Sequence, residues 1–305
     1  MTDLKNAVVA VTGGATGIGL ALARDAVRRG ARVMIIDVND AEEAVAALRQ
    51  EGGTVESTIA DVAELADVRR AVAETVDRFG GVNVVCNNAG TAAFGQLHEV
   101  DPDDARRVLR INVEGAFHVV HAFASPLRAS AAAGNSAYLL NTGSEHSLGV
   151  PPHVQPISIY TVSKYAVLGL TMTAHRDLGP WGIGVSMLAP GWTLTDNIRG
   201  LTEAHPKAAA AILPYAQDPA EVASMAFEGL LAGTRVIVTN PHSRAFAIEH
   251  AQKLIIDIQR LPEVDGQPTT VATATERRPG GRCGSVITPE AAVAAGRCRE
   301  STGSY

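Results

Sequence analysis

The sequence predicts an α/β protein built as one domain around a doubly wound, parallel seven-stranded sheet with helices on both faces. Short β-branched runs alternate with amphipathic stretches of helical length as far as about residue 260. Strands such as 33–36 are apolar at successive positions, which is typical of strands that are covered on both faces. The predicted strands are 7–12, 32–37, 54–60, 82–87, 137–142, 184–189 and 235–239, and the predicted helices are 17–29, 40–51, 64–79, 103–125, 157–178, 218–231 and 243–260.

The composition excludes several classes of protein. The 305 residues carry a net charge of −6 without a basic stripe, so a nucleic-acid partner is not expected. Apolar runs fall far short of the roughly 20 residues that cross a bilayer, and no secretion signal marks the N-terminus, so we expect a cytoplasmic protein without a membrane segment. Three cysteines lack metal-like spacing, and no metal is expected; Cys86, within a strand-like run, is interpreted as a buried thiol.

The domain is expected to cover residues 1–261. Beyond it, prolines recur at 262, 268, 279 and 289 and apolar periodicity fades, so residues 262–305 are predicted to form a flexible tail. The alternative is a tail that docks on a neighbouring subunit.

A glycine-rich loop joins the first predicted strand to the first predicted helix. Glycines allow a tight turn and close approach to a pyrophosphate, and the positive end of the helix attracts its charge. The loop contains Gly13, Thr16, Gly17, Ile18 and Gly19.

Asp37 ends the second predicted strand, about 20 residues after the loop. A carboxylate there can accept hydrogen bonds from the ribose hydroxyls of an adenosine, and it would repel a 2′-phosphate. Because Val38 supplies no compensating cation, the predicted cofactor is NAD rather than NADP.

Two further groups of turn residues follow strands at the predicted ligand crevice. Asp61 and Val62 follow the third strand, and Asn88, Ala89 and Gly90 follow the fourth. Both groups are candidates for cofactor contact, and both also suit ordinary strand-capping turns.

Tyr160 and Lys164 lie four residues apart in a predicted helix, and therefore on one face. Tyrosine has a reference pKa of about 10, so it acts as a base near neutrality only if a nearby positive charge favours the phenolate. Such pairs are also common on exposed surfaces. Ser144, at the end of the fifth predicted strand, places a hydroxyl at the same sheet edge as the glycine loop.

The ordered combination of the glycine loop, Asn88 to Gly90, Asn112, Ser144 and Tyr160 with Lys164 resembles the tyrosine-dependent short-chain dehydrogenases/reductases, over about residues 5–240. The resemblance implies a Rossmann fold with Tyr160 as general acid/base, Lys164 lowering its pKa and binding the nicotinamide ribose, and Ser144 polarising the substrate oxygen. It also implies that Asn112 holds a water in a proton relay. By the same resemblance, the segment containing Pro190, Gly191, Thr193 and Thr195 lies along the nicotinamide.

The sequence departs from the family pattern at two places. Ser144 stands 16 residues before Tyr160, whereas the family spacing points to Ser147. Ser144 is preferred because it follows the strand end directly. The other departure is the predicted helix 243–260 after the last strand, where many relatives carry a short glycine-rich segment.

The expected function is NAD-dependent hydride transfer between nicotinamide and a secondary alcohol or ketone, with isomerase, dehydratase or epimerase chemistry and a non-catalytic NAD-sensing module as alternatives. A mostly apolar set of candidate substrate contacts favours a moderately bulky substrate. The two histidines among them are either polar handles or solvated loop residues. The resemblance also implies that helices 103–125 and 157–178 pair across a two-fold axis, so a homodimer or homotetramer is expected. The candidate contacts are Phe94, His146, Leu148, Val150, His153, Trp192 and Leu194.

Overall fold

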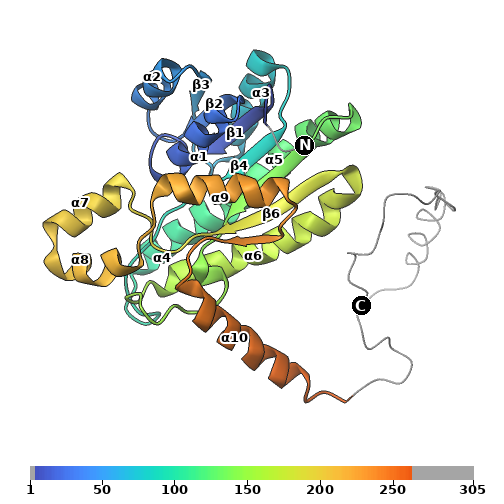
Figure 1. Ribbon diagram of the computed structural model, residues 1–305. Helices are drawn as coiled ribbons and strands as arrows, with labels where there is room; N and C mark the ends of the chain where they lie inside the picture. The colour runs from blue at the N-terminus through green and yellow to red at the C-terminus, as the bar shows by residue number, and fades with distance from the viewer. Residues whose placement is uncertain (1–3, 263–305) are drawn as a thin grey trace, which may run out of the picture. The chain divides into compact units, whose positions relative to one another are not determined.

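The computed structural model describes residues 4–262 and shows one parallel seven-stranded sheet surrounded by helices (Figure 1). The strand order is β3-β2-β1-β4-β5-β6-β7. The predicted fold class is confirmed. The strands are β1 (Val8–Thr12), β2 (Arg32–Asp37), β3 (Thr54–Ile59), β4 (Val84–Asn87), β5 (Ala137–Thr142), β6 (Ile183–Ala189) and β7 (Val236–Val238).

The order of the strands reverses between β1 and β4, because β2 and β3 lie on one side of β1 while β4 to β7 extend from the other. In an open parallel sheet, ligands bind outside the carboxyl ends of the strands at such a switch point. β1 is buried at all five positions, as expected for a strand covered on both faces. In the neighbouring β4, burial raises the pKa of the Cys86 thiol to about 12, so the prediction of a buried thiol is confirmed.

Two separate apolar cores fill the spaces between the sheet and its helices. On one face lie α1 (Gly17–Arg28), α2 (Glu42–Gln50) and α9 (Pro219–Leu231), which contribute Leu22, Leu48 and Phe227. The other face is covered by α3 (Leu65–Phe79), α5 (Ala116–Ala132) and α6 (Ser158–Leu178), with Phe123 at its centre. The sheet is therefore held from both sides.

The predicted helix 103–125 is longer and less regular than its periodicity indicates. It consists of α4 (Pro102–Leu109), a π-helical turn η1 (Arg110–Gly115) and α5. π-Helical turns are frequent at functional sites, and Asn112 lies in this one.

Two short helices after β6 were not predicted. α7 (Asp196–Ala204) and α8 (Pro206–Ile212) bury only Thr202 and Ile212, respectively. Both helices are short and each buries a single side chain, so neither presents the long core-facing stripe that identifies the other helices. The short turns are η2 (Glu145–Ser147), η3 (Gly179–Trp181) and η4 (Leu213–Tyr215).

The last described helix is α10 (Ser243–Ile258), where a helix over 243–260 was expected. It points away from the sheet in Figure 1, and only its first residue, Ser243, is buried. One compact unit ends at Ile258, and a second begins at Gln259. Apart from its first residue, the predicted flexible tail 262–305 lies outside the described residues. None of the helices within 4–262 is both long and apolar enough to cross a membrane.

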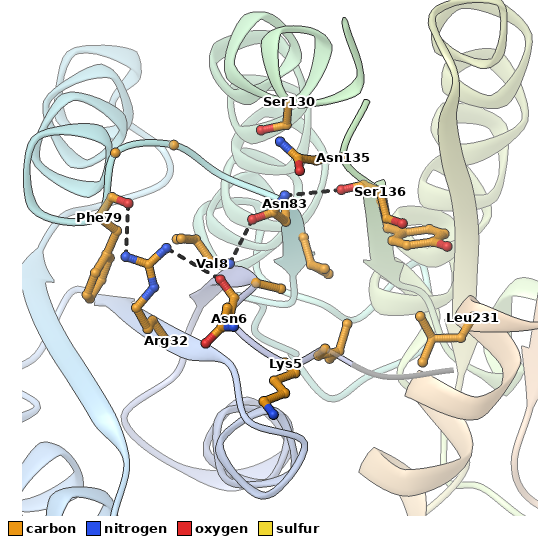
Figure 2. Close-up of a pocket in the computed structure, with 16 residues that line it drawn as sticks. Lys5, Asn6, Val8, Arg32, Phe79, Asn83, Ser130, Asn135, Ser136 and Leu231 are labelled. Atoms are coloured by element: carbon orange, nitrogen blue, oxygen red, sulfur yellow. Dashed lines mark hydrogen bonds between the residues drawn. The ribbon is translucent and has the colours of Figure 1, made fainter. Parts of the chain in front are cut away.

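A hollow lies at the amino ends of the strands, and several of the polar groups that line it are hydrogen-bonded to one another (Figure 2). The Arg32 guanidinium donates to the carbonyl oxygens of Phe79 at 3.1 Å and Asn6 at 3.4 Å. The Asn83 amide oxygen accepts from the backbone N–H of Val8 at 2.9 Å. Hydrogen bonds within the protein therefore occupy these polar groups at the amino edge of the sheet.

Candidate active site

The glycine loop at the carboxyl end of β1 has a backbone that only glycine fits. Gly13 and Gly17 have φ values of +62° and +59°, in the left-handed region. A Cβ on Gly19 would lie 1.9 Å from the Gly13 carbonyl oxygen. Thr16, the residue before α1, makes no side-chain capping bond, so the first-turn N–H groups of the helix have no cap from this residue. The loop therefore forms a cradle suited to a phosphate anion.

The Thr12 hydroxyl joins the ends of β1 and β4. It accepts hydrogen bonds from the backbone N–H groups of Asn88 at 2.9 Å and Ala89 at 3.1 Å. The Asn88 side chain donates in return to the Thr12 carbonyl oxygen at 3.1 Å. Asn88 thus supports the glycine loop, and a Cβ on Gly13 would lie only 2.9 Å from the Ala89 Cα.

Asp37 is buried at the end of β2 and faces the glycine loop. One carboxylate oxygen accepts from the backbone N–H of Ala15 at 3.0 Å, and the other accepts from the backbone N–H of Asn39 at 3.0 Å. Val38 beside it is 61% exposed. The carboxylate is consequently held in one position at the crevice.

Asp61 and Val62 follow the end of β3, where Asp61 forms a local turn. The Asp61 carboxylate accepts from the backbone N–H of Ala63 at 2.9 Å, which is the bonding of a local turn. The Val62 carbonyl oxygen lies 3.0 Å from Nδ1 of His118, on α5. Packing between Val62 and Gly115 leaves no room for a Cβ on that glycine.

Tyr160 and Lys164 lie on the first turns of α6 and meet Ser144, which follows β5. The Lys164 Nζ is 5.4 Å from the centre of the Tyr160 ring and donates to the Thr142 carbonyl oxygen at 2.8 Å. The Ser144 hydroxyl lies close enough to the Tyr160 hydroxyl to lower the pKa of Tyr160. Three groups named from the sequence therefore converge at the carboxyl edge of the sheet.

Burial acts on the two titratable groups of this cluster in opposite directions. It raises the pKa of Tyr160 to about 12, an effect that the nearby Glu145 carboxylate reinforces and the Ser144 hydrogen bond opposes. Burial lowers the pKa of Lys164 to about 8. In both cases the low-dielectric surroundings disfavour the charged form.

Asn112 ties the segment after β4 to α6. Its side-chain amide donates to the Thr91 carbonyl oxygen at 2.8 Å and to the Ser163 hydroxyl at 2.9 Å, while its oxygen accepts from the Thr91 N–H at 2.8 Å. A Cβ on Gly90 would lie 3.2 Å from the Asn112 oxygen and 3.6 Å from the Lys164 Nζ. Gly90, Asn112 and Lys164 are therefore close neighbours.

The two candidate serines have different surroundings. The Ser147 hydroxyl donates to the Lys164 carbonyl oxygen at 2.8 Å and accepts from the Ser144 N–H at 3.2 Å. Ser147 thus fastens η2 to α6 and is buried, with both bonds made to the backbone. Ser144 is the serine whose hydroxyl meets Tyr160.

Comparisons with known proteins agree with this arrangement. The family model described as short chain dehydrogenase matches residues 7–206. The chain belongs to the short-chain dehydrogenase family. It is 35% identical over 202 residues to the short chain dehydrogenase/reductase AacuN of Aspergillus aculeatus. The aligned region covers 65% of this chain and 74% of AacuN.

A second relative, 2-(S)-hydroxypropyl-CoM dehydrogenase 3 of Xanthobacter autotrophicus, is 34% identical over 200 residues, covering 65% of this chain and 75% of the relative. Among solved structures, a short-chain dehydrogenase/reductase of Burkholderia phymatum in complex with NAD aligns with a TM-score of 0.75 and 27% identity, over 89% of this chain and 100% of the other. Solved members of the short-chain dehydrogenase family hold NAD or NADP, so a nicotinamide cofactor belongs to this fold.

In this short-chain dehydrogenase, the segment after β6 lies against both the serine and the glycine loop. The Pro190 carbonyl oxygen accepts from the Glu145 N–H at 2.8 Å and the Ser144 hydroxyl at 3.4 Å. The Thr195 hydroxyl accepts from the Ile198 N–H at 3.4 Å at the start of α7, and its methyl carbon would lie 3.2 Å from a Cβ on Gly17. Thr193 is buried and donates to the Gly191 carbonyl oxygen at 3.1 Å.

The apolar candidate substrate contacts of the dehydrogenase occupy four different settings. Phe94 and Val150 are 64% and 73% exposed. Leu148 packs against the core residues Val167 and Met187, and Leu194 lines a hollow beside Gly17. Trp192 is half-buried, and its indole nitrogen is buried without a hydrogen-bond partner among the described residues.

The two loop histidines are not solvated. His146 is buried, packs edge-on against the Tyr160 ring at 5.4 Å between centroids, and hydrogen-bonds through Nδ1 to the Thr161 hydroxyl at 2.8 Å. Burial lowers the pKa of His146 to about 4, so this ring is neutral at physiological pH. His153 stacks on the Tyr215 ring at 4.3 Å.

Sequence reasoning overlooked Glu145, which is 2% exposed and directly follows Ser144. Its carboxylate accepts from the Ser243 hydroxyl at 2.7 Å and lies 3.3 Å from Nε2 of His153. The only signal in the sequence was an acidic residue beside the candidate serine. Its partner at 243 comes 98 positions later, beyond the reach of a local pattern.

The glycine cradle generates a prediction about Gly19. We expect Gly19→Ala to weaken NADH binding more than tenfold, because the added methyl must displace the loop carbonyl that it would contact at 1.9 Å. NADH fluorescence titration measures the affinity. Gly200→Ala, an exposed glycine of α7 with open space around it, is the control and should bind NADH normally. Normal affinity in a folded Gly19→Ala protein would place the cofactor elsewhere.

Proposed function

We propose that the protein is an NAD-dependent oxidoreductase that transfers a hydride between nicotinamide and a moderately bulky secondary alcohol or its ketone. The convergence of Ser144, Tyr160 and Lys164 at the sheet edge that also carries the glycine loop is the observation that carries this proposal. The relative named 2-(S)-hydroxypropyl-CoM dehydrogenase supports it, because a 2-hydroxypropyl group contains a secondary alcohol.

The residues at the crevice fit a dinucleotide cofactor. Gly13, Gly17 and Gly19 leave backbone space where side chains would block a pyrophosphate, and α1 presents its positive end there. When bound, nicotinamide supplies the site that accepts or donates the hydride. The remaining residues proposed to hold the cofactor are Thr16, Ile18, Asp37, Asp61, Val62, Asn88, Ala89, Gly90, Tyr160, Lys164, Pro190, Gly191, Thr193 and Thr195.

In the proposed reaction, the Tyr160 hydroxyl is the group that exchanges a proton with the substrate oxygen. During alcohol oxidation the Tyr160 phenolate takes the hydroxyl proton, and during ketone reduction the Tyr160 hydroxyl returns one. The Ser144 hydroxyl donates a hydrogen bond to the same substrate oxygen and stabilises the charge that develops on it.

Lys164 makes this chemistry possible near neutral pH. Burial is the largest of the effects that together raise the pKa of Tyr160 to about 12, which disfavours the phenolate. The Lys164 ammonium, 5.4 Å from the ring centre, favours the phenolate by charge attraction. Because the pKa of Lys164 is about 8, the ammonium form predominates below that pH. Asn112, fixed against Ser163 at 2.9 Å, is proposed to hold a water that links Lys164 to solvent.

The Asp37 carboxylate favours NAD over NADP in this proposal. It is fixed at the end of β2 by the Ala15 and Asn39 N–H groups, where an adenosine ribose would lie in this fold. A 2′-phosphate there would meet a negative charge, and the exposed Val38 offers no cation.

The direct test of this function is a panel of secondary alcohols and ketones assayed with NAD or NADH, with absorbance of the reduced cofactor as readout. We expect turnover with at least one moderately bulky alcohol, and loss of that turnover in Tyr160→Phe without loss of NAD binding. A product at the same oxidation level as its substrate would indicate isomerase, dehydratase or epimerase chemistry instead. Binding without turnover across the panel would favour a sensing module.

Asp37 provides a test of cofactor choice. Asp37→Ala combined with Val38→Arg should move the ratio of NAD to NADP affinity toward NADP, because the repulsive charge is removed and an attractive one is added. Dissociation constants for both cofactors, measured on both proteins, give the ratio. A wild-type protein that binds NADP more tightly, or a ratio that the double variant leaves unchanged, would contradict the assignment.

The serine assignment gives a third test. Ser144→Ala should lower turnover by roughly 10²-fold, since the lost hydrogen bond strengthens in the transition state, while NAD affinity stays the same. Ser147→Ala should keep most of the turnover but lose about 1–3 kcal/mol of stability, because a buried bond to the Lys164 carbonyl is removed. Turnover rates and thermal unfolding measure the two effects. The reverse ranking of activities would make Ser147 the working serine.

We also propose a homodimer or homotetramer that pairs the faces of α5 and α6. Large apolar side chains are exposed there, including Phe117 at 51%, Val162 at 47% and Met172 at 49%. Sedimentation at micromolar concentration should show a dimer or tetramer, and Phe117→Asp should shift the protein toward the monomer. A wild-type protein that sediments only as a monomer would rule this out.

A further inference from the structure

A group of polar and aromatic side chains surrounds Glu145, the residue that follows Ser144, and has no part in the reaction proposed above. We call it the Glu145 cluster; it consists of Glu145, His153, Tyr215, His242 and Ser243. Glu145 is its centre, because its carboxylate contacts Ser243 at 2.7 Å and His153 at 3.3 Å. The two contacts come from different parts of the chain.

A buried carboxylate is costly unless partners compensate its charge. No lysine or arginine forms an ion pair with Glu145 among the described residues, so its compensation comes from one hydroxyl and the imidazoles of His153 and His242. Burial raises the pKa of Glu145, whereas Ser243, His153 and His242 act to lower it. Moving any one of these partners away would remove part of that compensation, so the contacts constrain the segments that carry them.

The Glu145 cluster joins three segments of the chain. His153 belongs to the loop between η2 and α6, and its ring stacks on Tyr215 of η4 at 4.3 Å. The Tyr215 ring also meets His242 edge-on at 5.0 Å. Just before His242, the Asn240 side chain donates to the Tyr215 carbonyl oxygen at 2.7 Å.

The same cluster reaches the proposed catalytic and cofactor groups. The Glu145 backbone follows Ser144 and donates to the Pro190 carbonyl oxygen at 2.8 Å. Gly191, the next residue, packs so closely against Asn240 that a Cβ on it would lie 2.4 Å from the Asn240 side-chain nitrogen. The start of α10 is therefore connected both to the serine and to the segment proposed to line the nicotinamide.

We propose that Glu145 is a positioning residue, which holds the 148–157 loop and the first turn of α10 against Ser144 through its contacts with His153 and Ser243. This inference rests on the proposed function. In this role Glu145 has two separable effects. Its contacts with Ser243 and His153 hold the loop and the start of α10. Its negative charge stands between Ser144 and His146 in the chain, and both of those residues contact Tyr160.

The charge effect has a defined sign. The Glu145 carboxylate raises the pKa of Tyr160, and the titratable groups that face Glu145 are Tyr160 on α6, His153 on the loop and His242 before α10. His146 beside it is neutral, because burial holds its pKa at about 4, and Lys164 is turned toward the Thr142 carbonyl oxygen. Alcohol oxidation requires the Tyr160 phenolate, so removing the Glu145 charge should let the reaction begin at lower pH.

Three variants separate the charge from the hydrogen bonds. Glu145→Gln removes the charge but retains an oxygen that accepts from Ser243, so the acidic limb of the kcat/KM profile should move to lower pH with little change in KM. Ser243→Ala keeps the charge and loses the bond, so KM should rise about tenfold with the acidic limb in its wild-type place. Glu145→Ala should combine both effects.

Glu249→Gln is the matched control. Glu249 lies on α10, as Ser243 does, but it is exposed and pairs with Lys253 at 2.6 Å. The pH profile and KM of Glu249→Gln should therefore equal those of the wild type. Hydrogen exchange supplies a readout that needs no substrate: Ser243→Ala should exchange faster than the wild type over 148–157 and 240–246. If Glu145→Ala fails to fold, Ser243→Ala and Glu145→Gln still provide every comparison.

The outcomes distinguish this inference from the proposed function. A wild-type protein without alcohol turnover would overturn the function, while hydrogen exchange in Ser243→Ala would still test the positioning role. Wild-type KM and wild-type exchange in Ser243→Ala would overturn the positioning role. An acidic limb that stays in place in Glu145→Gln would overturn the electrostatic link to Tyr160.

Discussion

All seven strands run in the same direction, and this constraint brings the candidate residues of the site together. Parallel strands end at one edge, so Thr12, Asp37, Asn87 and Thr142, each the last residue of its strand, deliver the segments that follow them to a common crevice. The bonds from the Asn88 and Ala89 N–H groups to the Thr12 hydroxyl join the ends of β1 and β4, where the strand order reverses. The glycine loop rests on that junction.

The proposed chemistry takes place among groups whose burial opposes their charged forms. Tyr160 and Lys164 are both drawn toward neutrality by their low-dielectric surroundings. Low dielectric also strengthens the attraction between a phenolate and a nearby ammonium. The bond from Lys164 to the Thr142 carbonyl oxygen fixes the ammonium relative to the Tyr160 ring, as the proposed acid–base role of the pair requires.

In the Glu145 cluster, burial also acts on a charged group that would not touch the substrate. A carboxylate buried behind Ser144 makes the order of the 148–157 loop, η4 and the start of α10 interdependent, because each supplies a partner or packs on one. Much of α10 is exposed, yet its first residue is buried in the cluster. The end of the domain is thus connected to the centre of the proposed active site.

The sequence by itself determined where the strands lie along the chain, because periodicity located all seven of them. The spacing of Tyr160 and Lys164 placed both residues on one helical face. The sequence also located the glycine loop, because local backbone geometry there depends on the residues themselves. Tertiary structure decided which serine meets Tyr160, since Ser144 and Ser147 differ only in what surrounds them. It likewise decided the π-helical turn at Asn112 and the short helices α7 and α8, which bury one side chain each. The Glu145–Ser243 bond joins residues 98 positions apart, and only the packing of the whole domain could bring them together.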